Sequence, residues 1–251
     1  MISVLDFGAH AVIALIARKK KNGEWDILGG ADVRAQGVRQ GEIIHLGDAA
    51  ECVTEVLRLA ERSSGQSVKT LYFNFDHASI QKIETCGTKH LVGEGQIRPL
   101  DIRDAKEAAL RMVDSFDHGM IYAKETGFLI DEKDAVLNPI GIYGRRVDVF
   151  LSVWMADSAL LDRWNTLMGR AYVKTACPIL PDRGKVYGTA PAAGSLSARR
   201  QTPLDDPACA GAAEMLEVAY RLEQERPVYF EKENLFSNLK EKLVSTWNEY
   251  F

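Results

Sequence analysis

The sequence predicts an α/β fold, and three features of the chain support this prediction. Two short apolar runs separated by a glycine turn open the chain at residues 2–17, as in a β-hairpin. An amphipathic helical pattern then precedes a strand within residues 47–75. A strongly alternating strand at residues 145–153 lies between two segments with helical spacing. Strands and helices that alternate in this way form sheets covered by helices.

Composition narrows the possible functions of the 251-residue chain. The net charge of −4 provides no basic surface, so nucleic acid is not an expected partner. The four cysteines form no CxxC motif and no cluster with histidine, which argues against a zinc site and suits a reducing cytoplasm. The first residues do not resemble a signal peptide. No apolar run approaches the ~20 residues that span a bilayer, so any membrane contact is expected to be peripheral.

The first elements follow from apolar periodicity and turn residues. Residues 47–63 carry apolar side chains at helical spacing, and Asp48 is the expected N-cap of this helix. Strands are predicted on both sides of the helix, with the first turn at Gly8. The predicted strands are Ile2–Leu5, Val12–Ala17, Glu24–Val33 and Val68–Phe75.

The stretch at residues 137–154 organises the middle of the chain. Asn138-Pro139 stops any helix, because proline lacks a backbone donor and disfavours helical conformations of the residue before it. From Arg145 onward, polar residues alternate with valine and leucine, which predicts a half-buried strand. The acidic residues Glu42, Asp76 and Asp148 show no sign of converging and are expected at the surface or at strand ends.

Residues 83–154 are predicted to form a separate unit. A strand at Ile83–Val92 precedes a helix at Asp101–Val113, for which Asp101 is the expected cap. Three further strands complete the unit, at Gly119–Ala123, Phe128–Ile130 and Val147–Val153. The chain then continues into a helix at Ser158–Gly169, with Gly169 as its C-cap, and a strand at Tyr172–Cys177.

Two segments resemble FtsA, the actin-like bacterial cell division protein. NPIGIYGRRVDVFLSVW, at residues 138–154, is similar to the end of the family's inserted domain. GVRQGEIIHLGDAA, at residues 37–50, is similar to its G-[VI]-[KR]-x-G-x-[IV] segment. The resemblance extends in order through residues 1–181 and resumes at residues 206–222 and in the last helix. It implies a partial actin-like (ribonuclease H-like) subdomain 1A with an inserted SHS2-type α+β subdomain 1C.

The resemblance also implies a division of the chain, namely a shortened form that lacks the second lobe. The expected segments are 1–82, the first part of subdomain 1A; 83–154, subdomain 1C; 155–179, the continuation of 1A; 180–206, a linker in place of the second lobe; 207–232, the final helix of 1A; and 233–251, a C-terminal amphipathic helix.

The nucleotide site of the family is only partly matched. Asp6 and Gly8 fit the phosphate-1 loop, but the following hydroxyls and lysine are replaced by Ala9, His10 and Ala11. Asp6 and Gly8 are therefore either a non-functional remnant of that loop or a plain hairpin turn. The second phosphate loop, D-x-G-G-G-T, is absent from the sequence. We expect no ATP or other cofactor, no metal site and no catalytic residues, so the chain is not expected to be an enzyme.

The last 19 residues form an amphipathic pattern. Membrane-binding is expected of the apolar residues Leu235, Phe236, Leu239, Leu243, Trp247 and Phe251. The polar face has no excess of basic residues, unlike most membrane-surface helices. Insertion into a membrane and docking on protein therefore both remain open on pattern alone. The position of the helix resembles FtsA's membrane-targeting helix, which implies a cytoplasmic protein, peripheral on the inner face of the cell membrane.

The resemblance implies a membrane-associated, non-catalytic cell division adaptor that acts by protein contacts through subdomains 1A and 1C. Its expected partners are division-apparatus proteins, possible self-oligomers or full-length FtsA, and membrane lipid. The FtsZ tail is not expected, because in the family it docks on the second lobe. The alternatives are a PilM-like pilus-assembly adaptor and a degenerate nucleotide-binding actin-like protein. The G-[VI]-[KR]-x-G segment at residues 37–41 favours FtsA over PilM.

Overall fold

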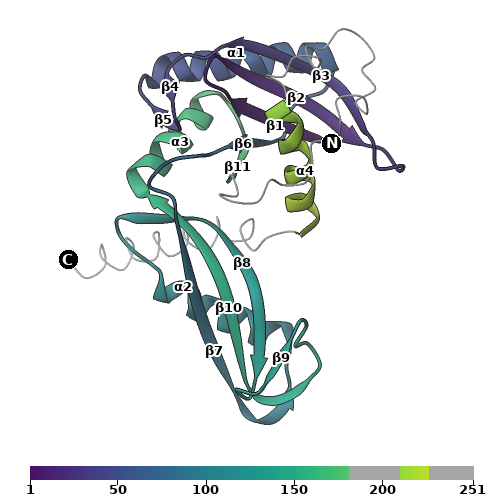
Figure 1. Ribbon diagram of the computed structural model, residues 1–251, viewed down its shortest axis with the longest axis vertical. Helices are drawn as coiled ribbons and strands as arrows, with labels where there is room; N and C mark the ends of the chain where they lie inside the picture. The colour runs from purple at the N-terminus through teal and green to yellow at the C-terminus, as the bar shows by residue number, and fades with distance from the viewer. Residues whose placement is uncertain (181–209, 226–251) are drawn as a thin grey trace, which may run out of the picture. The chain divides into compact units, whose positions relative to one another are not determined.

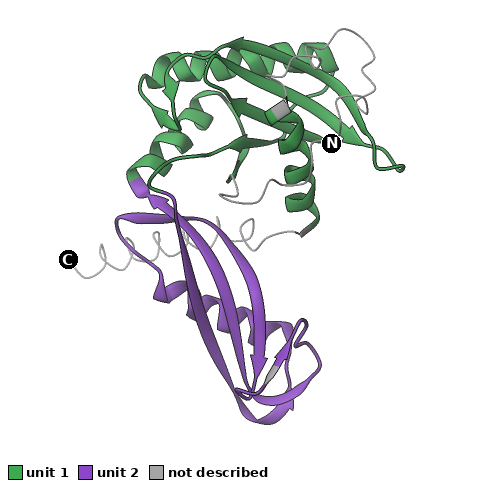
Figure 2. Cartoon of the chain, viewed as in Figure 1, with its two compact units in different colours: residues 1–79, 159–225 green, residues 80–158, 226–251 purple. Residues whose placement is uncertain are grey.

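The computed structural model describes residues 1–180 and 210–225, which divide into two compact units (Figure 2). Unit 1 comprises residues 1–79 and, after an interruption, the described residues from 159 to 225. Unit 2 comprises residues 80–158 among the described residues. The insert expected at residues 83–154 falls within unit 2. The expected linker and the terminal helix at residues 233–251 lie outside the described residues.

Unit 1 is built on a five-stranded sheet with the order β11-β6-β1-β2-β3 (Figure 1). Strands β1, β2 and β3 form an antiparallel meander, and β6 runs parallel to both β1 and β11. This is the strand order of a ribonuclease H-like sheet, the fold that the resemblance to FtsA implies. The strands are β1 (Ile2–Phe7), β2 (Ala11–Lys19), β3 (Trp25–Arg34), β6 (Thr70–Asn74) and β11 (Thr175–Ile179).

Helices cover both faces of this sheet. On one face, α4 (Ala210–Glu225) places Ala212, Met215, Leu216 and Ala219 into a core with apolar residues of all five strands. On the other face, α1 (Leu46–Ser64) packs against β2 and β3 with its buried stripe. Because both faces are covered, every residue of β2 from 12 to 17 is buried and the run is apolar throughout.

A small hairpin that the sequence did not predict precedes α1. It is formed by β4 (Val38–Arg39) and β5 (Glu42–Ile43), and two glycines with positive φ shape it. A side chain on Gly37 would place a Cβ 2.4 Å from the backbone nitrogen of Ala49, and one on Gly41 would lie 1.9 Å from the carbonyl oxygen of Asp76. Both positions therefore require glycine, which explains the spacing of the G-x-x-x-G segment.

The start of α1 differs from the sequence prediction. The helix begins at Leu46, so His45 rather than Asp48 is at the N-cap position. The carbonyl of His45 accepts the first helical hydrogen bond from Ala49 at 3.0 Å. Asp48 lies instead within the first turn, where its negative charge interacts favourably with the helix dipole.

Unit 2 is a four-stranded antiparallel sheet with the order β7-β10-β8-β9. Its strands are β7 (Gln81–Gln96), β8 (His118–Ile130), β9 (Asp134–Val136) and β10 (Tyr143–Asp157). Ile83 and Val153 are paired across β7 and β10, so the two ends of the expected insert lie side by side. An inserted domain requires such adjacent ends, since the host chain must leave and re-enter at one place.

One face of this sheet is covered by α2 (Pro99–Met112). Alternate residues of β10 from Val147 to Met155 form the core with apolar residues of α2 and β8. Gly87 in β7 permits the close approach of the helix: an added Cβ would lie 2.0 Å from the carbonyl oxygen of Ala105 and 2.4 Å from the nitrogen of Ala109. The α2 helix thus rests directly on the backbone of β7 at this point.

The strands of unit 2 are longer than the sequence predicts. Residues 119–123 and 128–130 were expected to be separate strands, but they belong to the single strand β8. The register between β8 and β10 shifts at two places, between Phe150 and Leu151 and between Trp154 and Met155. These bulges interrupt the alternation of apolar and polar residues, so the pattern of one strand resembles that of two.

The cap of α2 also differs from the prediction, because the helix begins before Asp101. Arg98 is at the N-cap, Pro99 is the first helical residue and Asp101 is at N3. The Asp101 carboxylate accepts hydrogen bonds from the backbone nitrogen of Arg98 at 2.9 Å and from its Nε at 3.2 Å. The Arg98 hydrogen bond holds the pKa of Asp101 below its usual range.

We expect Asp101→Ala to lower the free energy of unfolding by about 1 kcal/mol at pH 7, the usual value of a helix cap. Because folding depresses the pKa of Asp101, this stabilisation exists above its unfolded pKa of about 4 and is lost as the pH falls through the folded value. Urea unfolding at pH 7 and pH 2.5 measures both effects. Asp114→Ala, an exposed charge removal beyond the helix, is the control. Equal unfolding curves for Asp101→Ala and wild type at pH 7 would contradict the capping role.

The second half of unit 1 begins with α3 (Ser158–Arg170). Gly169 is not the C-cap as expected; the helix continues to Arg170, and Tyr172 adopts the left-handed conformation with φ of 59°. The nitrogen of Val173 then donates to the carbonyl of Met168 at 3.0 Å, which closes the helix end. The next strand, β11, starts later than predicted and includes Pro178, which is tolerated because β11 is at the sheet edge.

Candidate functional site

The expected phosphate loop is the turn that joins β1 to β2. The nitrogen of Gly8 donates to the carbonyl of Ala11 at 2.9 Å and closes the turn. A Cβ on Gly8 would lie 2.9 Å from that same carbonyl oxygen, so a glycine fits here best. The carbonyl of His10 accepts a hydrogen bond from Ala35. The structure therefore places Gly8 in a tight hairpin whose backbone groups at Gly8 and Ala11 bond to each other.

The Asp6 carboxylate lies just before this turn and is largely buried, with 9% of the residue exposed. Its Oδ1 accepts a hydrogen bond of 2.7 Å from the Asn74 side chain. The Asn74 Oδ1 in turn accepts a 2.7 Å hydrogen bond from the backbone nitrogen of Phe7. The side chain of Asn74 thus joins the carboxyl ends of the parallel strands β1 and β6.

The first turn of α4 contacts the other carboxylate oxygen of Asp6. A Cβ on Gly211 would lie 2.6 Å from Asp6 Oδ2, so the backbone of α4 closely approaches the carboxylate. Burial raises the pKa of Asp6 above its ordinary value. Asp6, Asn74 and Gly211 are therefore one cluster, although they are far apart in the sequence.

The sequence singled out Asp6 and Gly8 but missed Asn74 and Gly211. Asn74 could have been found from its place at the end of a strand parallel to β1, because ligand sites in α/β sheets gather at the carboxyl ends of strands. Gly211 could not, since nothing in the sequence shows that α4 returns to β1. Among the described residues, no group of three or more histidine, cysteine or acidic side chains is arranged to hold a metal ion.

A second cluster attaches α4 to the β2–β3 hairpin. Lys19 Nζ bonds both carboxylate oxygens of Glu217 at 2.8 Å, and Trp25 Nε1 donates to one of them at 3.3 Å. The same ammonium lies 4.3 Å from the ring centroid of Tyr220. Burial acts to raise the pKa of Glu217, but the hydrogen bond and charge of Lys19 outweigh burial and lower it. This cluster positions α4 on the sheet.

The second candidate region is the face of the unit 2 sheet opposite α2, which we call the open face. It consists of side chains from β7, β10 and β8 that alternate with the core residues. Cross-strand pairing arranges them in rows. The main residues of the open face are Lys82, Glu84, Cys86 and Thr88 from β7; Arg146, Asp148, Phe150, Ser152 and Trp154 from β10; and Tyr122, Lys124 and Leu129 from β8.

At one end of the open face, Asp148 is buried rather than at the surface as expected, with 2% of the residue exposed. Its Oδ1 accepts hydrogen bonds from Arg146 Nε at 3.0 Å and from the Thr88 hydroxyl. The Arg146 and Thr88 side chains contact the carboxylate directly. The charge of Asp148 is therefore satisfied within the sheet, in a structural role that the sequence did not show.

At the other end of the open face, polar and aromatic side chains lie next to each other. The Ser152 hydroxyl donates to the Glu84 carboxylate at 2.8 Å, and Lys82 pairs with Glu84 at 2.7 Å. Hydrogen bonds from Lys82 and then Ser152 lower the pKa of Glu84. Lys82 Nζ also lies 5.4 Å from the Trp154 ring centroid, and the Tyr122 and Trp154 rings are 5.0 Å apart. Such aromatic groups with polar partners are frequent in protein contacts.

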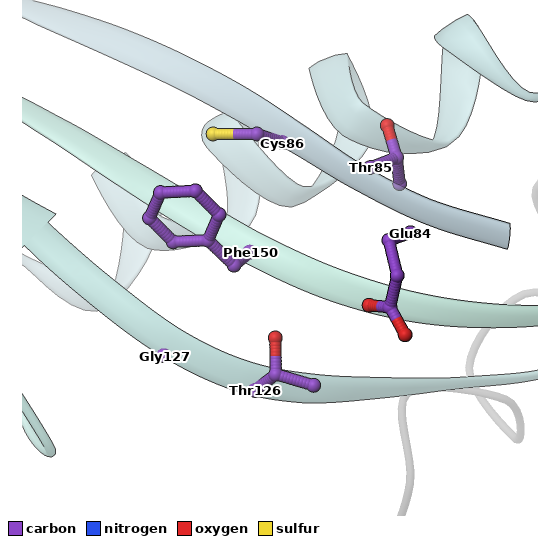
Figure 3. Close-up of a pocket in the computed structure, with 6 residues that line it drawn as sticks. All are labelled: Glu84, Thr85, Cys86, Thr126, Gly127 and Phe150. Atoms are coloured by element: carbon purple, nitrogen blue, oxygen red, sulfur yellow. The ribbon is translucent and has the colours of Figure 1, made fainter.

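Between these two ends the open face has a shallow hollow of about 370 Å³ beside Phe150 (Figure 3). Glu84, Thr85, Cys86, Thr126 and Gly127 line the hollow with Phe150. Phe150 itself is 39% exposed, although it lies in the middle of the sheet. Gly127 leaves space, since nothing lies within 4 Å of the position that its Cβ would take. A partly exposed aromatic ring next to a hollow is a feature of contact surfaces rather than of a closed pocket.

The expected membrane-binding residues, from Leu235 to Phe251, lie outside the described residues. Within the described part of the chain, no helix is both long enough and apolar enough to cross a membrane.

The comparisons with known proteins point to one family. The model of the SHS2 domain inserted in FtsA matches residues 78–154. The cell division protein FtsA of Rhizobium meliloti is 26% identical over 184 residues, which are 69% of this chain and 41% of the relative. FtsA of Streptococcus pneumoniae is 23% identical over 171 residues, 68% of this chain and 37% of the relative. The chain thus spans about two fifths of the length of these curated relatives.

Two solved structures are similar at a low level. A PilM–PilN type IV pilus biogenesis complex has a TM-score of 0.39 and 12% identity, over 72% of this chain and 46% of the other. A diol dehydratase-reactivating factor has a TM-score of 0.25 and 14% identity, over 52% of this chain and 19% of the other. The family match, together with the strand order of unit 1, confirms the predicted fold class of a partial actin-like domain with an SHS2-type insert.

Proposed function

We propose that this chain is a non-catalytic adaptor of cell division. It resembles FtsA, and the model of the SHS2 domain inserted in FtsA matches residues 78–154. It acts by protein contacts through units 1 and 2 and associates peripherally with the membrane. The observation that carries this proposal is the match of the SHS2 model to unit 2, joined to FtsA-like sequence outside that unit. Cell division is the role that the names of the curated relatives give.

The residues at the β1–β2 turn argue against binding of ATP by this chain. ATP bound in the manner of the family needs loop side chains and free amides that face phosphate. Here Gly8 bonds to Ala11, and the Asp6 carboxylate is held by Asn74 and contacted by α4. These residues do not fit a magnesium nucleotide, because burial favours the neutral form of Asp6 and no lysine lies in the turn.

We expect no saturable binding of Mg-ATP to the full chain in the micromolar range. Isothermal titration calorimetry measures this directly. The matched control is Asp6→Ala, which removes the one acidic group of the turn and should leave the flat titration unchanged. A saturable isotherm for wild type that is lost in Asp6→Ala would contradict the proposal and restore the degenerate nucleotide-binding alternative.

The terminal segment supports the proposed membrane association. Its apolar residues share roughly one half of a helical wheel, but the polar side lacks a basic excess. A short amphipathic helix without that attraction binds lipid weakly, because ordering the helix offsets much of the gain from burial. Several copies that act together would increase the strength of attachment. The segment therefore predicts reversible binding that depends on local concentration.

We expect Trp247→Glu to reduce co-sedimentation of the full chain with phospholipid vesicles at least 5-fold. A charged residue in place of an interfacial aromatic opposes insertion of the helix. Lys240→Ala, which keeps the apolar face, is the matched control and should sediment nearly as wild type. Equal sedimentation of wild type, Trp247→Glu and a chain that ends at Glu233 would contradict membrane binding by this segment and favour its docking on protein.

The adaptor function is tested by the proteins that the chain contacts in its source cell. In-cell crosslinking of the tagged full chain, followed by mass spectrometry, should enrich division proteins, full-length FtsA among them. Enrichment of pilus-assembly proteins in their place would overturn the proposal and favour a PilM-like adaptor.

A charge reversal on the α2 side of unit 2, Arg111→Glu, and one on its open face, Lys124→Glu, locate the contact. Each of these two residues is exposed, and each change alters the charge by the same amount. If unit 2 acts through its open face, only Lys124→Glu reduces the recovery of division proteins. If both variants recover division proteins as well as wild type does, the contact lies elsewhere on the chain.

A further inference from the structure

We propose that the terminal segment, residues 233–251, docks as a helix on the open face of unit 2 in its own chain, and that membrane lipid competes with the open face for it. The inference rests on the proposed function and deepens it, since it names what controls access to the contact surface of unit 2. With the segment docked, the open face is covered and partners are excluded. With the segment on lipid, the open face is free to bind them.

The open face of unit 2 lacks a covering layer among the described residues. α2 packs against the opposite side of the sheet. Unit 1 differs, because α1 and α4 cover its sheet from both sides. On the open face, Phe150 is 39% exposed and the Tyr122 and Trp154 side chains are partly exposed. A sheet with aromatic side chains on its free face is stabilised by a second helical layer.

The dimensions of the terminal segment match those of the open face. Residues 235–251 as a helix would be about 25 Å long. On β10, the open face extends from Arg146 to Trp154 in two-residue steps of about 6.8 Å, which gives about 27 Å. A helix is about 10 Å wide, and the outer two of the three strands are also about 10 Å apart. A single helix therefore covers the open face, as α2 covers the other side.

The centre of the open face offers a place for the aromatic side chains of the segment. Phe150 lies next to the hollow over Gly127 and Cys86 (Figure 3). The apolar half of the segment carries Phe236 and Trp247. A ring that enters the hollow would pack against the Phe150 ring, and aromatic anchors at the centre of a contact contribute most of its energy. Docking should therefore depend most on Phe150 and on Trp247, the larger of the two rings.

Charge complementarity favours the same occupant. The open face carries three basic and two acidic side chains, namely Lys82, Lys124, Arg146, Glu84 and Asp148. Lys124 is exposed, and Glu84 of the same row already pairs with Lys82. The terminal segment has the opposite balance, with two lysines and three glutamates. At about 100° per residue, Glu233 and Glu249 lie near the borders of its apolar half, where they can face Lys124.

The open face suits the segment better than a lipid surface alone does. Membrane-surface helices usually owe part of their attraction to a basic polar side, which this segment lacks. Docking on a face with a basic excess needs no such side. The segment is also tethered to the same chain, so its effective concentration at the face is on the order of 1 mM. With a dissociation constant of about 100 μM for the contact, roughly ten docked chains would exist for each open one.

The reactivity of Cys86 with iodoacetamide tests docking in the full chain without lipid, because Cys86 lines the hollow. Mass spectrometry of the Cys86 peptide gives the rate. The rate should be at least 5-fold higher in Trp247→Glu, and in a chain that ends at Glu233, than in wild type. Asn238→Ala, on the polar side of the segment, is the matched control and should react as wild type does. Cys52, buried in unit 1, should stay unreactive in every folded variant.

Two further measurements test the competition with lipid. Excess vesicles of phosphatidylcholine and phosphatidylglycerol in equal parts should raise the Cys86 rate of wild type to that of the shortened chain. At limiting lipid, Phe150→Gln should increase co-sedimentation of the full chain with these vesicles at least 3-fold, because it weakens docking and leaves the segment intact. Met112→Gln is the matched control, since it also replaces an exposed apolar side chain, but in α2, and it should sediment as wild type does.

Equal Cys86 rates in wild type, Trp247→Glu and the shortened chain would overturn the proposal. Protection of Cys86 that increases across a 100-fold rise in protein concentration would also overturn it, since the cover would then be a second molecule. A Cys86 rate that vesicles leave unchanged, or wild-type sedimentation of Phe150→Gln, would contradict the competition. Each of these failures leaves the adaptor function standing, since that function is tested by the division proteins recovered in the cell.

Discussion

Gly87→Val is expected to unfold unit 2 or to lower its free energy of unfolding by about 3 kcal/mol or more. Gly87 is where α2 rests on β7, and even a Cβ there would lie 2.0 Å from the Ala105 carbonyl oxygen. The nearest obstacles are backbone atoms of α2, at Ala105 and Ala109, so a side-chain rotation cannot relieve the clash. The helix must move away from the sheet, which opens the core between α2 and β10.

Amide hydrogen exchange by mass spectrometry measures this effect separately in each unit. Protection of β7 and β10 should fall in Gly87→Val, and protection of the unit 1 strands should stay as in wild type. Gly127→Ala is the matched control, because this glycine is in the same sheet but has open space at its Cβ position. We expect Gly127→Ala to change stability by less than about 0.5 kcal/mol. If β7 and β10 of Gly87→Val were as protected as in wild type, α2 would not lie as close to β7 as the structure shows.

Trp164→Ala is expected to destabilise unit 1 by about 4 kcal/mol, in the usual range for a buried tryptophan. Trp164 is only 2% exposed and contacts the rings of Phe7, Phe73 and Phe75, with centroids 5.0, 5.1 and 5.6 Å away. Its Nε1 also donates to the carbonyl of Gly41 at 3.1 Å. The substitution leaves both a cavity and a carbonyl without its donor.

Urea unfolding, followed by hydrogen exchange of β6, measures the loss at Trp164. Trp164→Phe separates its two contributions, since it keeps an aromatic ring in the cluster but removes the hydrogen bond to Gly41. We expect this control to cost about 1.5 kcal/mol, well below the alanine variant. Equal losses for the two variants would show that the hydrogen bond, and not the ring packing, accounts for the stability of this site.

Local patterns were sufficient to predict most of the elements. The apolar stripe of residues 47–63 identifies α1 to within one residue at each end, because helical periodicity is set by the chain itself. The alternation from Arg146 to Val153 identifies the centre of β10 but not its ends, because the strand extends from Tyr143 to Asp157. The glycine spacing at residues 37–41 reflects two positions where only a glycine fits, so the segment is specific enough to support the resemblance to FtsA.

Helix caps and strand ends were predicted less well. His45 and Arg98, rather than Asp48 and Asp101, occupy the N-cap positions. Each aspartate is within the first turn, where it still favours the helix, and the sequence does not distinguish these neighbouring positions. The continuity of β8 was missed because its bulges depend on the partner strand β10.

The sequence by itself determined the types of most elements, the similarity to FtsA, and Asp6 and Gly8 as the possible phosphate turn. Only the tertiary structure brought Asn74 and Gly211 to Asp6, and only strand pairing buried Asp148 beside Arg146 and formed the open face. The physical reason is the same in each case. Periodicity reports which side of an element is apolar, whereas the neighbours of a side chain are decided by contacts between segments that lie far apart in the chain.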